Sequence, residues 1–159
     1  MTFNTTFYLG AGYGGGTIFY LDGSAQHGLI DLGYNFGTSP VGCKWDYYPQ
    51  FGLGTSTAFG AGQANTMAIV NLIGEQGTAA YMCDTTNVNG YNDWFLPSKD
   101  ELNQLYLYHL SISYGFMSNY CWSSSEYYIE DAWIQDINFG NQIYVSKTQY
   151  QYVRPIRAF

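Results

Sequence analysis

The sequence predicts an α+β domain in which two helices pack on small antiparallel sheets, with long loops between the elements. Runs of β-branched and aromatic residues lie near both ends of the chain, and two segments with helical spacing lie between them. Strands and helices that are separated along the chain in this way are typical of α+β domains. The chain has 159 residues, a length that favours one domain with a single core.

The N-terminal part of the chain predicts a β-hairpin. Residues 17–21 (TIFYL) and 27–32 (HGLIDL) have the composition of strands. Asp22-Gly23-Ser24 between them is a turn signal. We therefore expect two antiparallel strands before the first helix.

A glycine-rich segment over residues 10–16 precedes this hairpin. No Lys-Ser or Lys-Thr follows it, so it does not match a phosphate-binding loop, and we interpret it as a turn or linker. The sequence thus predicts a lead-in segment (residues 1–13) and one domain (residues 14–159). Residues 33–62 are rich in Gly, Thr, Ser, Tyr and Pro and predict a long irregular insertion.

Residues 63–72 predict the first helix. Four of its residues recur at helical spacing, namely Ala64, Met67, Ala68 and Leu72. Gly74 and Gly77 end this pattern, and residues 79–83 are expected to extend it as a second short helical piece.

The start of the second helix has the clearest local signal. Ser98 and Glu101 are spaced as a capping box, in which the Ser98 hydroxyl accepts from the Glu101 amide and the Glu101 carboxylate accepts from the Ser98 amide. Because the cap explains Glu101, we do not interpret it as a catalytic acid. One helix face follows, formed by Leu102, Leu105, Tyr106 and His109.

The last forty residues predict an antiparallel set of strands. Candidate strands lie at residues 120–124, 132–138, 142–147 and 152–159. Pro155 has no N–H to donate, so the last strand is expected to have an edge or a bulge there.

The charge balance excludes several classes of partner. The chain has 5 Lys and Arg against 12 Asp and Glu, a net charge of −7. Nucleic acid and anionic membranes require clustered cations, so neither is expected as a partner. No segment is long and apolar enough for membrane insertion, and no signal peptide is visible after Met1.

No catalytic or metal-binding pattern is evident. The two His are far apart in the sequence, and the serines at 123–125 lack the Gly-x-Ser-x-Gly pattern of a hydrolase, so we expect no enzyme activity. Cys43, Cys83 and Cys121 have no CxxC spacing; three buried thiols and one bridge both fit them.

Calcium is the one cofactor that the sequence leaves open. The candidate oxygen ligands are Asn92, Asp93, Glu126, Glu130, Asp131 and Asp136. They do not form a dense calcium loop, and we expect Asp93 and Asp136 to pair with Arg154 or Arg157 inside the fold. We therefore predict no metal site and no cofactor.

Several segments follow one another in an order that resembles a known bacterial family. They are GGGTIFYLDGSAQHGLI (14–30), GQANTMAIV (62–70), GYNDWFLPSKDELNQLY (90–106), YCWSSSEY (120–127), AWIQD (132–136) and YVRPIRAF (152–159). The chain resembles the C-terminal domain of the Legionella collagen-like adhesin type from about Gly14 to Phe159. The resemblance implies a C-type lectin-like fold. The acidity of this chain removes the basic face that sulfated glycans would need.

The same family overlaps with variable proteins of diversity-generating retroelements, which rewrite codons in a C-terminal region of a lectin-like scaffold. Residues of the type that adenine-directed mutagenesis produces alternate here with framework-like pieces such as Trp122–Ser125. The residues that fit this set are Tyr127, Tyr128, Ile129, Ile143, Tyr144, Val145, Ser146, Thr148 and Tyr150.

We therefore predict a ligand-binding or receptor-recognition module with a C-terminal variable surface. Tyr supplies a large contact area at low entropic cost, and Ser, Asn and Gln add adaptable hydrogen bonds. The predicted ligand-binding residues are Tyr127, Tyr128, Ile129, Glu130, Asp131, Trp133, Gln135, Phe139, Asn141, Ile143, Tyr144, Ser146, Gln149 and Tyr150.

The alternative function is a carbohydrate-binding adhesin domain, with or without calcium, that is not diversified. In either case the expected partner is a cell-surface protein or glycan, and the expected location is the cell surface, the extracellular space or a virion. A homo-oligomer or a larger fibre is the expected assembly.

Overall fold

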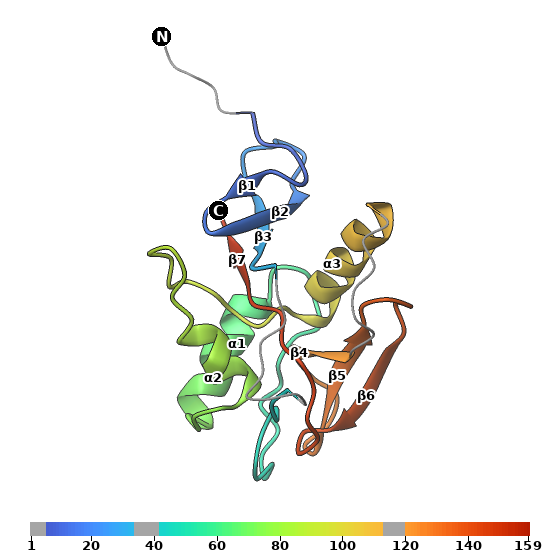
Figure 1. The fold of residues 1–159 in the computed structure, drawn as a ribbon. Helices are drawn as coiled ribbons and strands as arrows, with labels where there is room; N and C mark the ends of the chain where they lie inside the picture. Colours follow the sequence, from blue (N-terminus) through green and yellow to red (C-terminus); the bar gives the residue numbers. More distant parts are fainter. Residues whose placement is uncertain (1–5, 34–41, 113–119) are drawn as a thin grey trace.

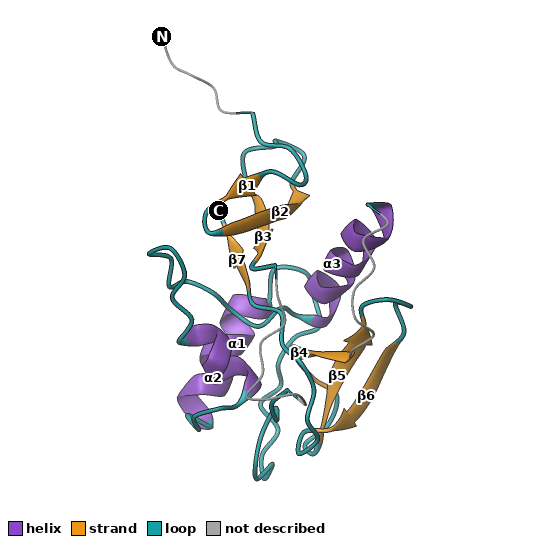
Figure 2. Cartoon of the chain, viewed as in Figure 1, coloured by secondary structure: helices purple, strands orange, loops and turns teal. Residues whose placement is uncertain are grey.

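The computed structural model describes residues 6–33, 42–112 and 120–159, and within them it has three helices and two small antiparallel sheets (Figures 1 and 2). This confirms the predicted α+β class. The elements in chain order are β1 (Gly12–Tyr13), β2 (Gly16–Leu21), β3 (Gly28–Asp31), α1 (Gly62–Leu72), α2 (Ala79–Asp84), α3 (Lys99–Ser111), β4 (Tyr120–Glu126), β5 (Asp131–Asp136), β6 (Gln142–Ser146) and β7 (Ile156–Ala158). Residue 119, parts of the predicted lead-in and parts of the predicted insertion lie outside the described residues.

The two sheets divide the strands differently from the prediction. One sheet has the order β1-β2-β3-β7, and the other has the order β4-β5-β6. The prediction of a single C-terminal set is therefore wrong for residues 152–159. Tyr152 still lies beside β4, where its carbonyl accepts from the Trp122 amide at 2.8 Å. Beyond Pro155 the chain crosses to the N-terminal sheet, and Arg157 pairs with Ile30.

The first sheet begins earlier than the predicted domain boundary. Residues 12–13 pair with β2, and the Phe7 ring lies 4.7 Å from the Tyr13 ring and 4.9 Å from the Phe159 ring. Part of the predicted lead-in is thus packed on the domain. Gly14 turns the chain at a φ of +55°, and a Cβ there would lie 2.4 Å from an Arg157 nitrogen, so only glycine fits.

Helix α1 buries a different face from the one that its apolar residues suggest. Met67 and Leu72 are 57% and 58% exposed, whereas Asn65 and Thr66 are buried. The Asn65 side chain binds the Ser56 backbone and the Ser124 hydroxyl, and Thr66 accepts from the Leu96 amide. Specific hydrogen bonds, together with the burial of Ile69 in the core, orient this helix. The predicted short helical piece forms a separate helix, α2.

Helix α3 begins at the predicted capping box. The Glu101 amide donates to the Ser98 hydroxyl at 3.3 Å, and the Ser98 amide donates to the Glu101 carboxylate at 2.8 Å. That carboxylate also accepts from the amides of Gly60 and Gly62, both at 3.1 Å. Glu101 therefore joins the starts of two helices in addition to capping one. Leu102, Leu105 and His109 are buried, as the predicted face requires.

Two buried tryptophans connect the irregular segment after residue 41 to the rest of the fold. Trp45 donates its indole N–H to the Ser123 carbonyl, and Trp122 donates to the Cys43 carbonyl, both at 2.9 Å. Each bond joins the segment after residue 41 to β4. The described part of the predicted insertion is therefore fixed to the core by these bonds and does not lie loosely on the surface.

The cysteines are free and buried. Burial raises the pKa of Cys43 and of Cys121 to about 12, and it raises the pKa of Cys83 well above its usual range. A thiol that stays protonated is a poor nucleophile. Of the two alternatives that the sequence left open, the structure has three buried thiols.

A buried ion pair links the end of β3 to the segment just before β7. Arg154, 1% exposed, pairs with Asp31, 3% exposed, and His109 Nε2 lies 3.8 Å from the same carboxylate. Burial alone would raise the pKa of Asp31, but Arg154 and His109 outweigh it and hold this pKa below its usual range. The pair therefore stabilises the fold above about pH 4, the usual carboxylate pKa, and loses that contribution as pH falls through the lowered pKa.

Substituting Arg154→Met should destabilise the domain by about 3–5 kcal/mol at pH 7, because the Asp31 carboxylate would stay buried without its main partner. Urea unfolding from pH 4 to 8 measures this. The difference from the unsubstituted chain should shrink as pH falls and Asp31 becomes protonated in the variant. The matched control, Lys44→Met, removes one cation that forms no ion pair among the described residues. Equal losses in the two variants would refute this role of Arg154.

Candidate ligand-binding surface

The outer face of the β4-β5-β6 sheet carries the candidate site. Along β5, Ala132 and Ile134 point into the core, and Trp133 between them points outward. Trp133 is paired with Tyr144 on β6. The alternation of side chains on a strand therefore sets these two aromatic residues next to each other on the outer face.

Three aromatic rings pack together there. The rings of Tyr127 and Tyr144 are stacked, with centroids 3.7 Å apart and planes 10° apart. Trp133 meets both edge-on, at 5.3 Å and 5.7 Å. The Lys99 ammonium lies 4.0 Å from the centre of the Trp133 ring. We call Tyr127, Trp133 and Tyr144 the aromatic cluster. The two tyrosines remain 48% and 47% exposed.

A turn at the end of β4 extends this surface. Residues 127–130 are all exposed. Beneath them lies Lys147, which is fully buried and whose ammonium pairs with Glu126 and donates to the Ile129 carbonyl at 2.7 Å. The other Glu126 oxygen accepts from the amides of Leu53 and Gly54, at 2.9 Å and 3.0 Å. These bonds hold the turn in one position.

Most of the predicted ligand-binding residues lie at the surface. The exposed ones are Tyr127, Tyr128, Ile129, Glu130, Phe139, Asn141, Ile143, Tyr144, Gln149 and Tyr150, and the half-buried ones are Asp131, Trp133 and Ser146.

They do not form one patch, however. Phe139 and Asn141 lie in the β5–β6 turn, at the opposite end of the hairpin from residues 127–131. At about 3.3 Å per residue, the three residues from Trp133 to the end of β5 at Asp136 already span roughly 10 Å, and the turn with Phe139 follows beyond them.

Gln135 is wrong as a ligand-binding residue. Its side chain is fully buried and donates to Asn103 Oδ1 on α3 at 2.8 Å and to the Gly140 carbonyl at 3.2 Å. The first turns of α3 cover this half of the outer face, so alternation along β5 places Gln135 under a helix and not in solvent. Lys147 was missed by the sequence reasoning, because a lysine inside a polar segment normally points to solvent.

The candidate calcium ligands are largely engaged within the protein. Asp93 pairs with Arg157 at 2.6 Å and 2.7 Å, as expected. Asp136 was expected to pair with an arginine but instead accepts from the amides of Asn138 and Phe139, so it stabilises a turn. Glu126 is occupied by Lys147. Within residues 6–33, 42–112 and 120–159, no three His, Cys, Asp or Glu side chains gather as a metal site.

No helix in the described part of the chain is long and apolar enough to cross a membrane.

Comparison with known proteins places the chain in a family. The family described as "Lcl C-terminal domain" matches residues 38–157, which is more than half of the chain and includes β4, β5 and β6. No curated protein sequence matches the chain. The two small antiparallel sheets and three helices agree with the C-type lectin-like fold of that family, as the resemblance implied. The chain therefore belongs to the Lcl C-terminal domain family.

Proposed function

We propose that this chain is a recognition module that binds a cell-surface protein or glycan through the aromatic cluster and the adjoining turn at residues 127–130. The observation that carries the proposal is an exposed aromatic cluster next to a turn that the buried Lys147 and Glu126 side chains hold in place. Rings that already pack on one another lose little conformational freedom when a ligand covers them. Membership in the family supports a ligand-binding, adhesin-type role.

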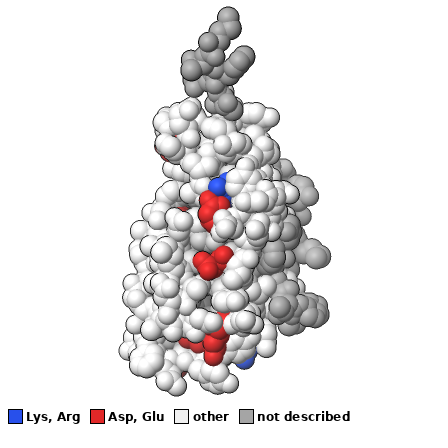
Figure 3. Space-filling view, turned by 90° about the vertical axis from the view of Figure 1, so that its left-hand side faces the viewer, with Lys and Arg blue, Asp and Glu red and all other residues white. Residues whose placement is uncertain are grey.

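The charge distribution indicates that a ligand is recognised by its shape and by hydrogen bonds, and not by the attraction of an anionic ligand to free cations. On the face drawn in Figure 3, acidic side chains lie in a broken column surrounded mostly by uncharged surface. All five Lys and Arg side chains pair with a carboxylate or lie over an aromatic ring. An acidic partner would find little to neutralise its charge here.

The proposed location is the cell surface or a virion, where an adhesin-type domain meets its ligand. No catalytic step is part of the proposal. A carbohydrate-binding adhesin would use the same aromatic cluster, so the alternative differs in ligand and not in site.

Replacing Tyr144 with Ser should lower binding to immobilised host-cell extract or to a glycan array by at least about tenfold, because it removes one of two stacked rings at the centre of the surface. The matched control is Tyr8→Ser, which removes a tyrosine that is 68% exposed and lies in the N-terminal segment before β1. The thermal midpoint of both variants should change little. Equal binding by the two variants would contradict the proposed surface.

We further propose that the surface is diversified by a retroelement. Of the nine positions that fit adenine-directed mutagenesis, none is buried, although Val145 packs partly against the core. The framework pieces on either side of these positions, residues 122–125 and 153–157, are buried. Exchange of one side chain at these nine positions would thus change the surface with little cost to the fold.

Sibling copies of the gene should differ at these nine positions and agree at residues 122–125 and 153–157. Sequencing of the source genome tests this, together with a search for a nearby reverse-transcriptase gene and a near-repeat of the codons for residues 119–159 mismatched at adenines. Siblings whose differences are spread evenly over the domain would refute diversification and leave the undiversified adhesin.

A further inference from the structure

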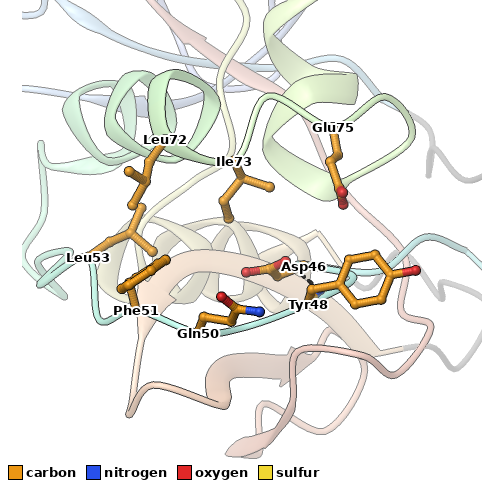
Figure 4. A pocket seen from close by; sticks show the side chains of 8 residues that line it. All are labelled: Asp46, Tyr48, Gln50, Phe51, Leu53, Leu72, Ile73 and Glu75. Carbon is orange, nitrogen blue, oxygen red and sulfur yellow. Dashed lines mark hydrogen bonds between the residues drawn. The ribbon is translucent and has the colours of Figure 1, made fainter.

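A second site lies beside the turn at residues 127–130. A cavity of about 230 Å³ opens between the loop at residues 46–53 and the connection from α1 to α2. Figure 4 shows the side chains that line it, which are Asp46, Tyr48, Gln50, Phe51, Leu53, Leu72, Ile73 and Glu75. We call it the acidic pocket. Its volume falls below the roughly 300 Å³ of small-molecule sites, so it suits one side chain better than a whole ligand.

The lining has a polar part and an apolar part. Phe51, Leu53 and Leu72 lie together on one side, and the carboxylates of Asp46 and Glu75 lie toward the other side with the Gln50 amide near Asp46 (Figure 4). A long aliphatic stem that ends in a positive charge matches both parts. A divalent cation matches only the polar part, because calcium takes six to eight oxygen ligands and gains nothing from an apolar wall.

The two carboxylates are not neutralised within the described residues. Asp46 is 6% exposed and accepts from the Tyr48 amide at 2.8 Å, which uses one oxygen of the carboxylate. Glu75 Oε2 is buried and accepts no hydrogen bond from any described group. A buried charged oxygen without a donor is costly, and a cation placed against it would remove that cost.

The position of both carboxylates is set by the backbone. The Asp46 amide donates to the Lys147 carbonyl at 3.2 Å, beneath the turn at residues 127–130. Glu75 lies just after Gly74, which has a φ of +59°, and the Glu75 carbonyl accepts from the Thr78 hydroxyl at 2.8 Å. These bonds fix the backbone positions from which both acidic side chains line the pocket.

The pocket adjoins the proposed recognition surface. A Cβ added at Gly52 would lie 3.7 Å from both Glu126 Oε2 and Ile129 Cγ1, so the loop beside Phe51 touches the turn. A partner that covers the turn at residues 127–130 would therefore lie next to the pocket. Three of the five cations of this chain form ion pairs within the fold, and Lys44 and Lys99 each lie over an aromatic ring, so a second copy offers few cations to the pocket and a different protein is the expected occupant.

We infer that the acidic pocket receives a lysine or arginine side chain of a protein partner. This inference rests on the proposed recognition function and narrows its ligand to a protein with an exposed cationic residue. The cationic head would lie against Asp46 and Glu75, and its stem would lie along Phe51, Leu53 and Leu72. Tyr48 and Phe51 at the margin, 74% and 65% exposed, provide aromatic faces for the cation.

The test is a titration of the ¹⁵N-labelled domain with Nα-acetyl-arginine amide and Nα-acetyl-lysine amide, followed by amide chemical shifts. Both should shift the amides of Asp46, Gln50 and Glu75 with millimolar affinity, and the neutral Nα-acetyl-citrulline amide should not. Glu75→Gln should weaken binding about tenfold, because it removes a charged hydrogen bond. Asp84→Asn removes one charge from an exposed position on α2 and should leave the affinity unchanged.

Equal shifts with citrulline, or equal affinities of the Glu75→Gln and Asp84→Asn variants, would overturn the inference. Saturation of the same amides by CaCl₂, with no response to the organic cations, would overturn it in favour of a metal site. Binding of the small cations by the Tyr144→Ser variant should be normal. If Tyr144→Ser no longer binds the cellular ligand and Glu75→Gln still binds it, the proposed recognition function is supported and the proposed cationic contact is refuted.

Discussion

The buried ammonium of Lys147 is the contact on which the candidate surface most depends. It binds the Glu126 carboxylate at the end of β4 and the Ile129 carbonyl in the turn, and it lies 4.4 Å from the centre of the Trp45 ring. Through Glu126 it also holds the amides of Leu53 and Gly54. One ion pair thus fixes the exposed turn, the loop of the acidic pocket and the end of the sheet. A buried ion pair adds little net stability to a fold. Removal of either Lys147 or Glu126 would leave the other charge buried without a partner, so the pair strongly favours this one arrangement of the turn.

A low content of charge has a consequence for recognition. Arg154 and Lys147 are inside the fold, and Arg157 lies mostly buried against Asp93. Three of the five cations therefore form ion pairs within the fold, and the other two, Lys44 and Lys99, lie over aromatic rings, so the surface consists mostly of uncharged polar groups, aromatic rings and carboxylates. Such a surface can change its side chains without disturbing the ion pairs beneath it. The same separation leaves the acidic pocket as the place where a positive charge of a partner is most favourable.

The sequence-based predictions are correct for contacts between residues that are close in the sequence, and they fail for contacts between residues that are far apart. The capping box of α3 needs only residues 98–101, and it forms as predicted. The pairing of residues 156–158 with β3 joins the two ends of the chain, and no local pattern indicates which sheet the last strand enters. The partner of Arg154 is Asp31, 123 residues away, whereas Asp93 or Asp136 was expected.

Predictions for the candidate site divide in the same way. Strand alternation correctly sets Trp133 outward, and it fails for Gln135 only because α3 covers that end of the sheet. Composition identified the tyrosines of the surface, but it did not identify the buried Lys147–Glu126 pair that holds the adjoining turn. A buried lysine and an acidic pocket built from residues 46–53 and 72–75 depend on segments that meet only after folding, so the sequence carries no local sign of either.

We infer that the buried side chains of residues 120–159 determine the fold, and that the exposed side chains of the same segment can be substituted at little cost in stability. A saturation scan of residues 120–159, with folding free energy measured by protease resistance of the displayed domain, tests it most directly. We expect most substitutions at Tyr128, Ile143 and Thr148 to change the free energy of unfolding by less than about 0.5 kcal/mol. Substitutions at Ser124, Gln135, Lys147 and Arg154 should cost more than about 2 kcal/mol. The same distribution of losses at both sets of positions would contradict the account.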